Sequence, residues 1–275
     1  MNAEAVLNGI EARCRRMVTP CGDGQMAWRI WGAGAPLVFI HGGAGAWSHW
    51  IRNIPEFEAD RMVIAPDLPG LGDSASPPKP YSPESIAQIA ADGLRQVLPA
   101  GVQCDMAGFS FGGMISGIMA SLLGERVRSL TVMGPSGLGG TFGNIGIPKK
   151  LPLHGTPEEV LAVHRHNLRA IMLHDPEKID ELALYVQAVN APRTRILSPE
   201  HANSEKLFMA LHKVTAQVNS IWGEYDISSP YLEHRRQHIA EVHPNAAFHI
   251  IPNAGHWVQY EASEAVNALL RKIIA

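Results

Sequence analysis

The chain alternates between short runs of consecutive apolar residues and longer segments with helical periodicity, and this alternation is the strongest constraint on its fold. The apolar runs are residues 36–40, 61–66, 102–108, 127–134, 218–223 and 247–255. A strand buried on both faces is apolar throughout, so these runs predict parallel strands. The helical segments among them include residues 82–98, 111–124 and 263–274. The alternation predicts an α/β protein with a doubly wound, mostly parallel sheet.

The first two strands are expected to be joined directly by a turn. Residues 13–32 contain two strand-like stretches on either side of Gly22-Asp23-Gly24, so we expect a β-hairpin at the beginning of the sheet. With 275 residues, 46% of them hydrophobic, the chain can form one globular domain with a sizeable core and an insertion.

The composition argues against several classes of partner. The formal net charge is −3 and no block of basic residues stands out, so nucleic acid is not an expected partner. No apolar run approaches the roughly 20 residues that span a bilayer. The first residues lack the apolar core and cleavage site of a secretory signal. We therefore expect a cytoplasmic protein that does not bind a membrane.

The cysteines and histidines indicate neither a disulfide scaffold nor a metal site. The three cysteines, Cys14, Cys21 and Cys104, are odd in number and have no framework or metal-ligand spacing. Cys104 falls in an apolar strand, where a thiol packs as a small hydrophobe. His164 and His166 are the closest metal-like pair, and we do not expect them to hold a metal.

One long segment interrupts the alternation. Residues 137–212 contain no convincing strand, but they contain helical patterns at 156–173, 176–190 and 198–214. We predict that this segment is a helical cap inserted between core strands, and that residues 1–136 and 213–275 form the core. The alternative is a helical excursion that packs on one side of the sheet.

A serine follows the third apolar run, where ligands of α/β sheets bind beyond the carboxyl ends of strands. Ser110 lies between Gly108 and Gly112 in a G-x-S-x-G pattern. The two glycines permit a sharp strand-to-helix turn that exposes the hydroxyl. Phe111 then begins a helix, and its N–H is a candidate donor to an oxyanion. The alternative is an ordinary serine in a glycine-rich turn, since the pattern is short enough to occur by chance.

Residues 41–47, HGGAGAW, follow the first parallel strand and form a glycine-rich turn. Such a turn lets the backbone approach a ligand closely. We expect the N–H of Gly43 to be the second oxyanion donor and Gly42 to lie beside the substrate. The alternative is a flexible glycine loop without a role in binding.

An acid and a base follow the last two predicted strands. Asp226 is the first well-placed acid beyond residues 218–223, with Glu224 as its nearby competitor, and His256 lies in a loop after the final strand. A serine hydroxyl needs a base at neutral pH, and the base needs an acid to fix its tautomer. The chain order Ser110, Asp226, His256 is the nucleophile–acid–base order of α/β-hydrolases. The alternative for Asp226 is a turn or helix-cap residue.

Nearly the full length of the chain resembles the α/β-hydrolase superfamily. The matching landmarks occur in order: HGGAG, DLPGLGDS, GFSFGG, WGEYD and AGHW. The resemblance implies the α/β-hydrolase fold, in which residues 137–212 would be the cap. It also implies that Asp67 and Asp73, in DLPGLGDS, belong to a structural turn and not to the site. Dimers are common among such proteins, so a homodimer is a further expectation.

Three stretches, HGGAGAWSHWIRNI, VMGPSGLGG and AGHWVQYE, are similar to the meta-cleavage-product hydrolases, which cut a carbon–carbon bond. Those enzymes usually carry an asparagine before the nucleophile and a cap arginine for the substrate carboxylate. Here Phe109 precedes Ser110, and Tyr185 falls where the arginine is expected, with Arg169, Arg193 and Arg195 nearby in sequence. The asparagine of the glycine loop in that family falls near His49.

These features predict a serine hydrolase that acts through an acyl-enzyme on a small, largely apolar carbonyl substrate, with a carboxylic ester as the first expectation. Phe109 and Trp257 are candidate substrate contacts, and so is Tyr185; Met172 and Leu173 could close the pocket from the cap. No metal or organic cofactor is expected. The alternatives are a carbon–carbon hydrolase, a cofactor-free haloperoxidase-like activity, and a slow or non-catalytic ligand-binding homologue. Ser110 argues against dehalogenases and epoxide hydrolases, which need a carboxylate nucleophile.

Overall fold

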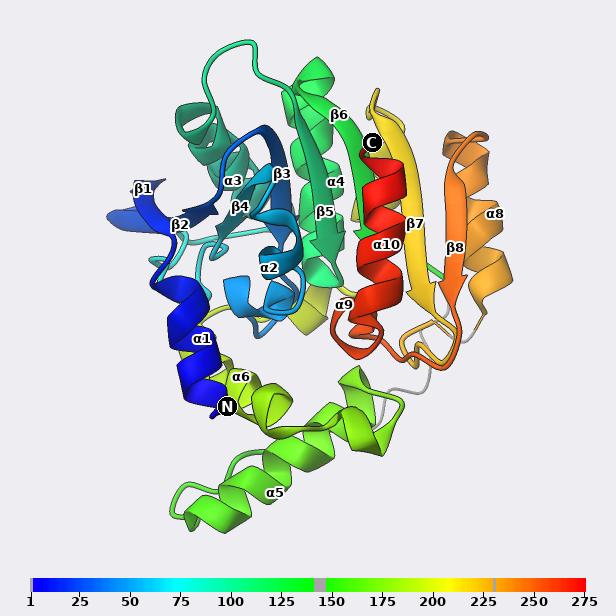
Figure 1. Cartoon of the computed structure of the whole chain (residues 1–275). Coiled ribbons are helices and arrows are strands. Elements are labelled where there is room, and N and C mark those ends of the chain that lie inside the picture. Colours follow the sequence, from blue (N-terminus) through cyan, green and yellow to red (C-terminus); the bar gives the residue numbers. More distant parts are fainter. Residues whose placement is uncertain (1, 141–146, 230) are drawn as a thin grey trace.

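The computed structural model describes residues 2–140, 147–229 and 231–275 and is built around one eight-stranded sheet (Figure 1). The strand order is β1-β2-β4-β3-β5-β6-β7-β8. The strands are β1 (Arg15–Cys21), β2 (Gly24–Trp31), β3 (Ala35–Ile40), β4 (Arg61–Pro66), β5 (Cys104–Phe109), β6 (Val127–Met133), β7 (Gln217–Gly223) and β8 (Ala247–Ile251).

The pairing of the strands confirms the predicted doubly wound sheet. Strands β1 and β2 form the expected antiparallel hairpin around the turn at Gly22, and β2 also pairs antiparallel with β4. The remaining pairs are parallel. The last strand is shorter than its apolar run, because β8 ends at Ile251 and the chain then turns toward His256.

The sheet separates two hydrophobic cores, which explains why the parallel strands are apolar throughout. In β3, Leu37 and Phe39 belong to the core on one face, whereas Val38 and Ile40 belong to the core on the other. All four side chains are fully buried. Since neighbouring residues of a strand point to opposite faces, a strand covered on both sides favours apolar side chains at consecutive positions.

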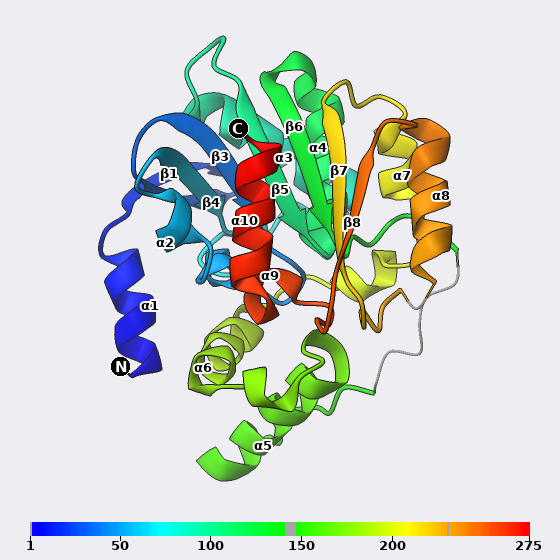
Figure 2. The same cartoon turned by 45° about the vertical axis from the view of Figure 1, so that its right-hand side comes forward.

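The helices form two layers, one on each face of the sheet (Figures 1 and 2). One layer contains α3 (Pro83–Val97), α4 (Phe111–Leu123), α7 (Lys206–Leu211) and α8 (Leu232–Val242). The other contains α2 (Ile54–Phe57), α9 (Val258–Glu261) and α10 (Ser263–Ile273). Four α-helices of the described residues were not predicted: α2, α8, α9 and α1 (Ala3–Glu11), which packs against α6 (Glu181–Asn190).

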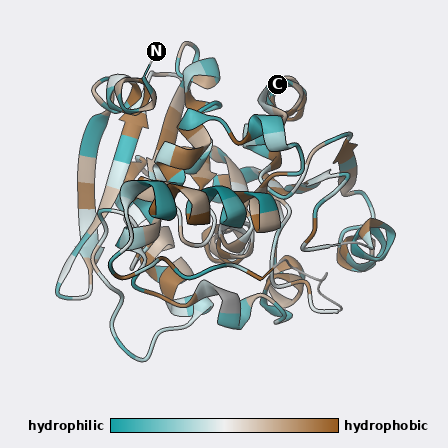
Figure 3. Ribbon diagram, turned by 90° about the horizontal axis from the view of Figure 1, so that it is seen from below, coloured by the Kyte–Doolittle hydropathy of each residue, from teal (hydrophilic) through white to brown (hydrophobic). Residues whose placement is uncertain are grey.

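The segment after β6 carries the helices that cross the carboxyl ends of the strands (Figure 3). These are α5 (Pro157–Asn167), which continues into a π-helical turn at Leu168–Met172, and α6 (Glu181–Asn190). Helix α7, in contrast, packs against α4 on the sheet. The division of the chain into a core and a cap at residues 137 and 212 stays a prediction, and residues 141–146 lie outside the described part. Among the described residues, no helix combines the length and apolar character needed to cross a bilayer.

Candidate active site

Ser110 occupies a sharp turn between β5 and α4, as the G-x-S-x-G pattern predicts. Its backbone has φ 53° and ψ −119°, a conformation that is unusual for a residue with a side chain. Gly108 and Gly112 are required because neighbouring atoms leave no room for a side chain at either position. A Cβ on Gly108 would lie 2.2 Å from the hydroxyl oxygen of Ser116, and a Cβ on Gly112 would lie 2.1 Å from the carbonyl oxygen of His41.

Replacing Gly112 by alanine is expected to lower the free energy of unfolding by about 1–3 kcal/mol, because the new methyl group collides with backbone that cannot move freely. Gly9→Ala is the matched control: Gly9 is also helical, but a Cβ there has no heavy atom within 4 Å. That variant should gain roughly 0.5–1 kcal/mol. Urea unfolding of both variants measures the difference. Equal stability of the two would show that the turn tolerates a side chain.

The structure brings together the three residues that the sequence predicts as nucleophile, base and acid. The Nε2 atom of His256 is 3.0 Å from the Oγ of Ser110. The Nδ1 atom of His256 is 2.9 Å from Oδ2 and 3.0 Å from Oδ1 of Asp226. His256 and Asp226 are both buried. The carboxylate therefore accepts the Nδ1 proton, which leaves Nε2 free to accept the proton of the serine hydroxyl.

Asp226 is held by the turn that follows β7. Its Oδ1 accepts hydrogen bonds from the backbone N–H of Ser228 at 2.9 Å and from the hydroxyl of Ser228 at 2.6 Å. The competing acid, Glu224, is turned elsewhere, since its carboxylate accepts from the N–H of Asn253. The geometry thus distinguishes the two acids that the sequence placed near each other.

The structure brings the two predicted oxyanion donors close together, since a Cβ on Gly43 would lie 3.7 Å from the Cβ of Phe111. Phe111 is the first residue of α4, and Gly43 lies in the turn after β3. Within the part of the chain that the structure describes, neither N–H donates to another group. A Cβ on Gly42 would lie 3.3 Å from the Cβ of Ser110, and one on Gly43 would lie 2.2 Å from the Oγ of Ser198. The backbone of this turn therefore approaches both the predicted nucleophile and the segment between β6 and β7, which contains Ser198 and is called the inserted segment below.

The turn DLPGLGDS has the structural role that the resemblance implies. The carboxylate of Asp67 accepts from the N–H of Trp47 at 2.9 Å and pairs with the buried guanidinium of Arg29 at 3.0 Å. The N–H of Leu68 donates to Nε2 of His41, and burial lowers the pKa of that imidazole. These bonds hold the glycine turn after β3 in place beside Ser110.

His49 is a buried residue of the site that sequence reasoning did not assign. Its Nδ1 accepts a hydrogen bond from the N–H of Gly42 at 3.2 Å, and its ring lies between those of Phe109 and Trp257. Burial first, and then the nearby His41 and His256, hold its pKa well below the ordinary value. His49 is therefore neutral, and its Nε2 carries the proton. The only sequence signal was its place near the asparagine of a related family.

The predicted substrate contacts differ in where the structure places them. The ring of Phe109 lies 4.9 Å from that of His256, and the buried Trp257 donates from Nε1 to the carbonyl of His49 at 3.0 Å. Tyr185, in contrast, lies on α6, where burial and the charge of Glu4 in α1 raise its pKa. Substrate contact stays a prediction for all three.

The arginines of the inserted segment are bonded to protein groups. Arg193 pairs with Asp73 at 3.1 Å. Arg195 donates to the carbonyls of Gly72 and Ser74, and Arg169 donates to those of Leu173 and His174. Two of the three thus hold the segment to the DLPGLGDS turn, which is an interaction the sequence did not reveal.

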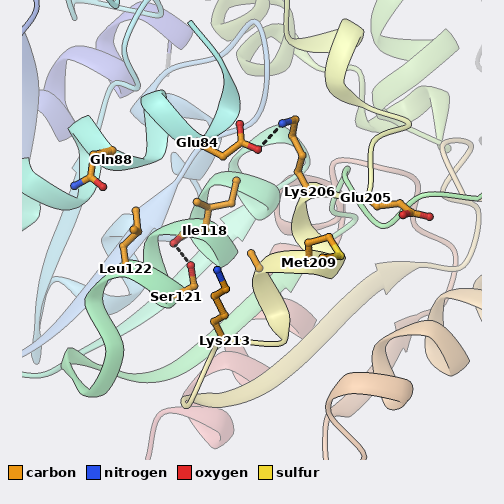
Figure 4. A pocket seen from close by; sticks show the side chains of 10 residues that line it. Glu84, Gln88, Ile118, Ser121, Leu122, Glu205, Lys206, Met209 and Lys213 are labelled. Atoms are coloured by element: carbon orange, nitrogen blue, oxygen red, sulfur yellow. Dashed lines mark hydrogen bonds and ion pairs between the residues drawn. The ribbon is translucent and has the colours of Figure 1, made fainter.

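A small cavity of about 60 Å³ adjoins His256. Its lining includes Met172 and Leu173, the two candidates from the sequence for closing the pocket from the cap. A larger groove of about 530 Å³ lies between α3, α4 and α7, where Lys206 pairs with Glu84 (Figure 4). The lining of that groove contains none of the three residues predicted as nucleophile, base and acid.

A doubly wound sheet with a strained serine after β5, an acid after β7 and a histidine after β8 defines the class of α/β-hydrolase enzymes. The model of the alpha/beta hydrolase family matches residues 37–269. Because this range covers most of the chain, the protein belongs to the alpha/beta hydrolase family, and it is an enzyme of this fold.

Comparisons with individual proteins point to two kinds of hydrolase. The chain is 29% identical over 264 residues to the 2-hydroxy-6-oxo-6-phenylhexa-2,4-dienoate hydrolase of Burkholderia cepacia, and the match covers 89% of each chain. The esterase RhEst1 of Rhodococcus sp. ECU1013 has a TM-score of 0.78 at 18% identity, over 95% of this chain and 98% of that one. The meta-cleavage product hydrolase CumD of Pseudomonas fluorescens IP01 has a TM-score of 0.73 at 19% identity, over 94% and 97%. The two structural matches show the fold alone.

Proposed function

We propose that the protein is a serine hydrolase in which Ser110, His256 and Asp226 form the catalytic triad. The observation that carries the proposal is the continuous chain of contacts from Ser110 Oγ through both nitrogens of His256 to Asp226, at 3.0 and 2.9 Å. The burial of Asp226 and His256 strengthens it, since charges interact more strongly away from water.

In the proposed mechanism, His256 accepts the hydroxyl proton of Ser110 as the oxygen attacks a carbonyl carbon. The N–H groups of Gly43 and Phe111 donate to the resulting oxyanion, and loss of one such donor typically costs about 10²–10³-fold in rate. His256 then gives its proton to the leaving group and the acyl-enzyme forms. In the second half, His256 activates a water molecule, which releases the acid and restores the serine.

A carboxylic ester is the substrate class that we propose first. Phe109, with its apolar ring beside His256, replaces the polar residue expected for carbon–carbon cleavage. Arg169, Arg193 and Arg195 are each bonded to protein groups, so none is left for a substrate carboxylate without breaking those bonds. The second candidate is the hydrolysis of a carbon–carbon bond in a 2-hydroxy-6-oxo-dienoate, which the printed name of the Burkholderia cepacia relative favours.

The test compares turnover of a short-chain p-nitrophenyl ester and a 2-hydroxy-6-oxo-dienoate by one preparation. We expect the ester to have the higher kcat/KM by at least about tenfold, the size of effect that one differential contact typically gives. A preference for the dienoate would support carbon–carbon hydrolysis and assign the carboxylate to an arginine that changes partners. Turnover of neither substrate would support a slow or ligand-binding homologue.

A further inference from the structure

The carboxylate of Glu261 lies outside the proposed triad but is joined to the loop that carries the base. Glu261 is the last residue of α9 and is 5% exposed. Its Oε2 accepts from the N–H of Gly255 at 2.6 Å and from the N–H of His174 at 3.1 Å. Its Oε1 accepts from the N–H of Asp175 at 2.6 Å. One side chain thus binds the residue before His256 and two residues of the segment that leads from α5 to α6.

The same segment contacts the base loop at a second point. The N–H of Trp257, the residue after His256, donates to the carbonyl of Met172 at 2.7 Å. His256 therefore lies between two residues that are each linked to residues 172–175. The approach is close, because a Cβ on Gly255 would lie 2.7 Å from the backbone nitrogen of His174.

Residues 172–175 also touch the loop of the acid. The ring of His174 stacks on that of Tyr225 with centroids 3.9 Å apart and an interplanar angle of 15°. Tyr225 immediately precedes Asp226, and its N–H donates to the carbonyl of Ala254 at 2.9 Å. In Figure 1, α9 lies at the carboxyl ends of the strands, between α10 and the inserted helices. The segment is therefore seated on both loops that position the imidazole.

We propose that Glu261 is a positioning residue that fastens residues 172–175 to the His256 loop, so that seating of the inserted segment and alignment of the base occur together. The inference rests on the proposed function of His256 as the base. Its physical basis is the set of three N–H donors, one of them buried and two partly buried, that converge on the two oxygens of one buried carboxylate. Loss of that group frees the backbone on one side of His256 while the other side stays bonded to Met172.

Glu261→Gln tests the proposal because it keeps the shape of the side chain but turns one acceptor into an NH₂ donor that faces other donors. We expect kcat for the ester to fall about 10–100-fold with KM changed less than about threefold, since a shift of roughly 1 Å at a reacting group can cost 10² in rate. The rate of Ser110 modification by a fluorophosphonate should fall by a similar factor. Hydrogen exchange at the amides of His174, Asp175 and Gly255 should become faster.

Asp105→Asn is the matched control. Asp105 is also a buried carboxylate with several partners, Arg128 and Ser129 among them, but it lies near the amino end of β5, opposite to Ser110. The Asp105→Asn variant should have a lower thermal midpoint of unfolding than the wild type and an unchanged kcat. The proposal is overturned if Glu261→Gln lowers the thermal midpoint but leaves kcat unchanged. It is also overturned if hydrogen exchange at the amides of His174, Asp175 and Gly255 is unchanged. A wild-type protein that neither turns over the substrates nor is labelled at Ser110 would instead contradict the proposed function, and the exchange data alone would then test the fastening.

Discussion

Replacing Ser110 by alanine is expected to lower the turnover of the preferred substrate by about 10⁵–10⁶-fold and to abolish labelling by a fluorophosphonate. The nucleophilic oxygen is lost, and the remaining rate comes only from the oxyanion donors and substrate binding. The rest of the site stays in place, because alanine keeps the Cβ and the backbone bond from the N–H of Ser110 to the carbonyl of Met133. Steady-state rates and mass spectrometry of the labelled protein measure the two effects.

Ser121→Ala is the control for this experiment. Ser121 lies on α4, the helix that follows the turn, and its hydroxyl donates to the carbonyl of Ile118. Its removal should leave both turnover and labelling intact. Labelling that persisted in Ser110→Ala would mean that a different residue is the nucleophile.

Replacing Asp226 by asparagine is expected to lower kcat by about 10⁴-fold with little change in fold, because the amide is nearly the same shape as the carboxylate. The amide NH₂ can donate to Nδ1 of His256, which places the imidazole proton on Nε2. In that tautomer Nε2 cannot accept the proton of Ser110, although the 3.0 Å contact between the two atoms remains. Stopped-flow or steady-state rates with the ester measure the loss.

Two further variants make the assignment of the acid specific. Ser228→Ala removes a hydroxyl that donates to Asp226 at 2.6 Å but leaves the carboxylate, so it should cost no more than about a hundredfold, the value of one hydrogen bond to a charged group. Glu224→Gln removes the competing acid and should be nearly neutral. A large loss in Glu224→Gln together with an active Asp226→Asn would reverse the two roles.

The parts of the molecule that could be predicted from the sequence are those with a local signal. Each of Ser110, Asp226 and His256 directly follows an apolar run, so its place at the carboxyl edge of the sheet could be inferred without knowing any contact. The strands were also predictable, because burial on both faces leaves a continuous apolar run, as in Leu37–Ile40 with its alternate residues in two different cores.

The interactions that the sequence did not reveal join segments far apart in the chain. Glu261 and His174 are separated by 87 residues, and their bond uses a backbone N–H, which every non-proline residue carries. The prediction for Tyr185 was limited in the same way. A helical pattern does not show which other helix packs against it, and in the structure α6, which carries Tyr185, packs against α1. Helix α1 itself was missed, although Asn2 caps it through a hydrogen bond to the N–H of Glu4.

Helix α1 also bears on how the chain can fold during synthesis. Its two partners are made at very different times: Trp31, whose indole donates to the carbonyl of Ile10 at 2.8 Å, follows soon after, whereas α6 begins only at Glu181. At translation rates of 5–20 residues per second, roughly 10–35 s separate the emergence of α1 from that of α6. Until the ribosome has made more than half of the protein, the apolar side of the first helix can therefore pack only on segments already synthesised, such as the early hairpin that carries Trp31.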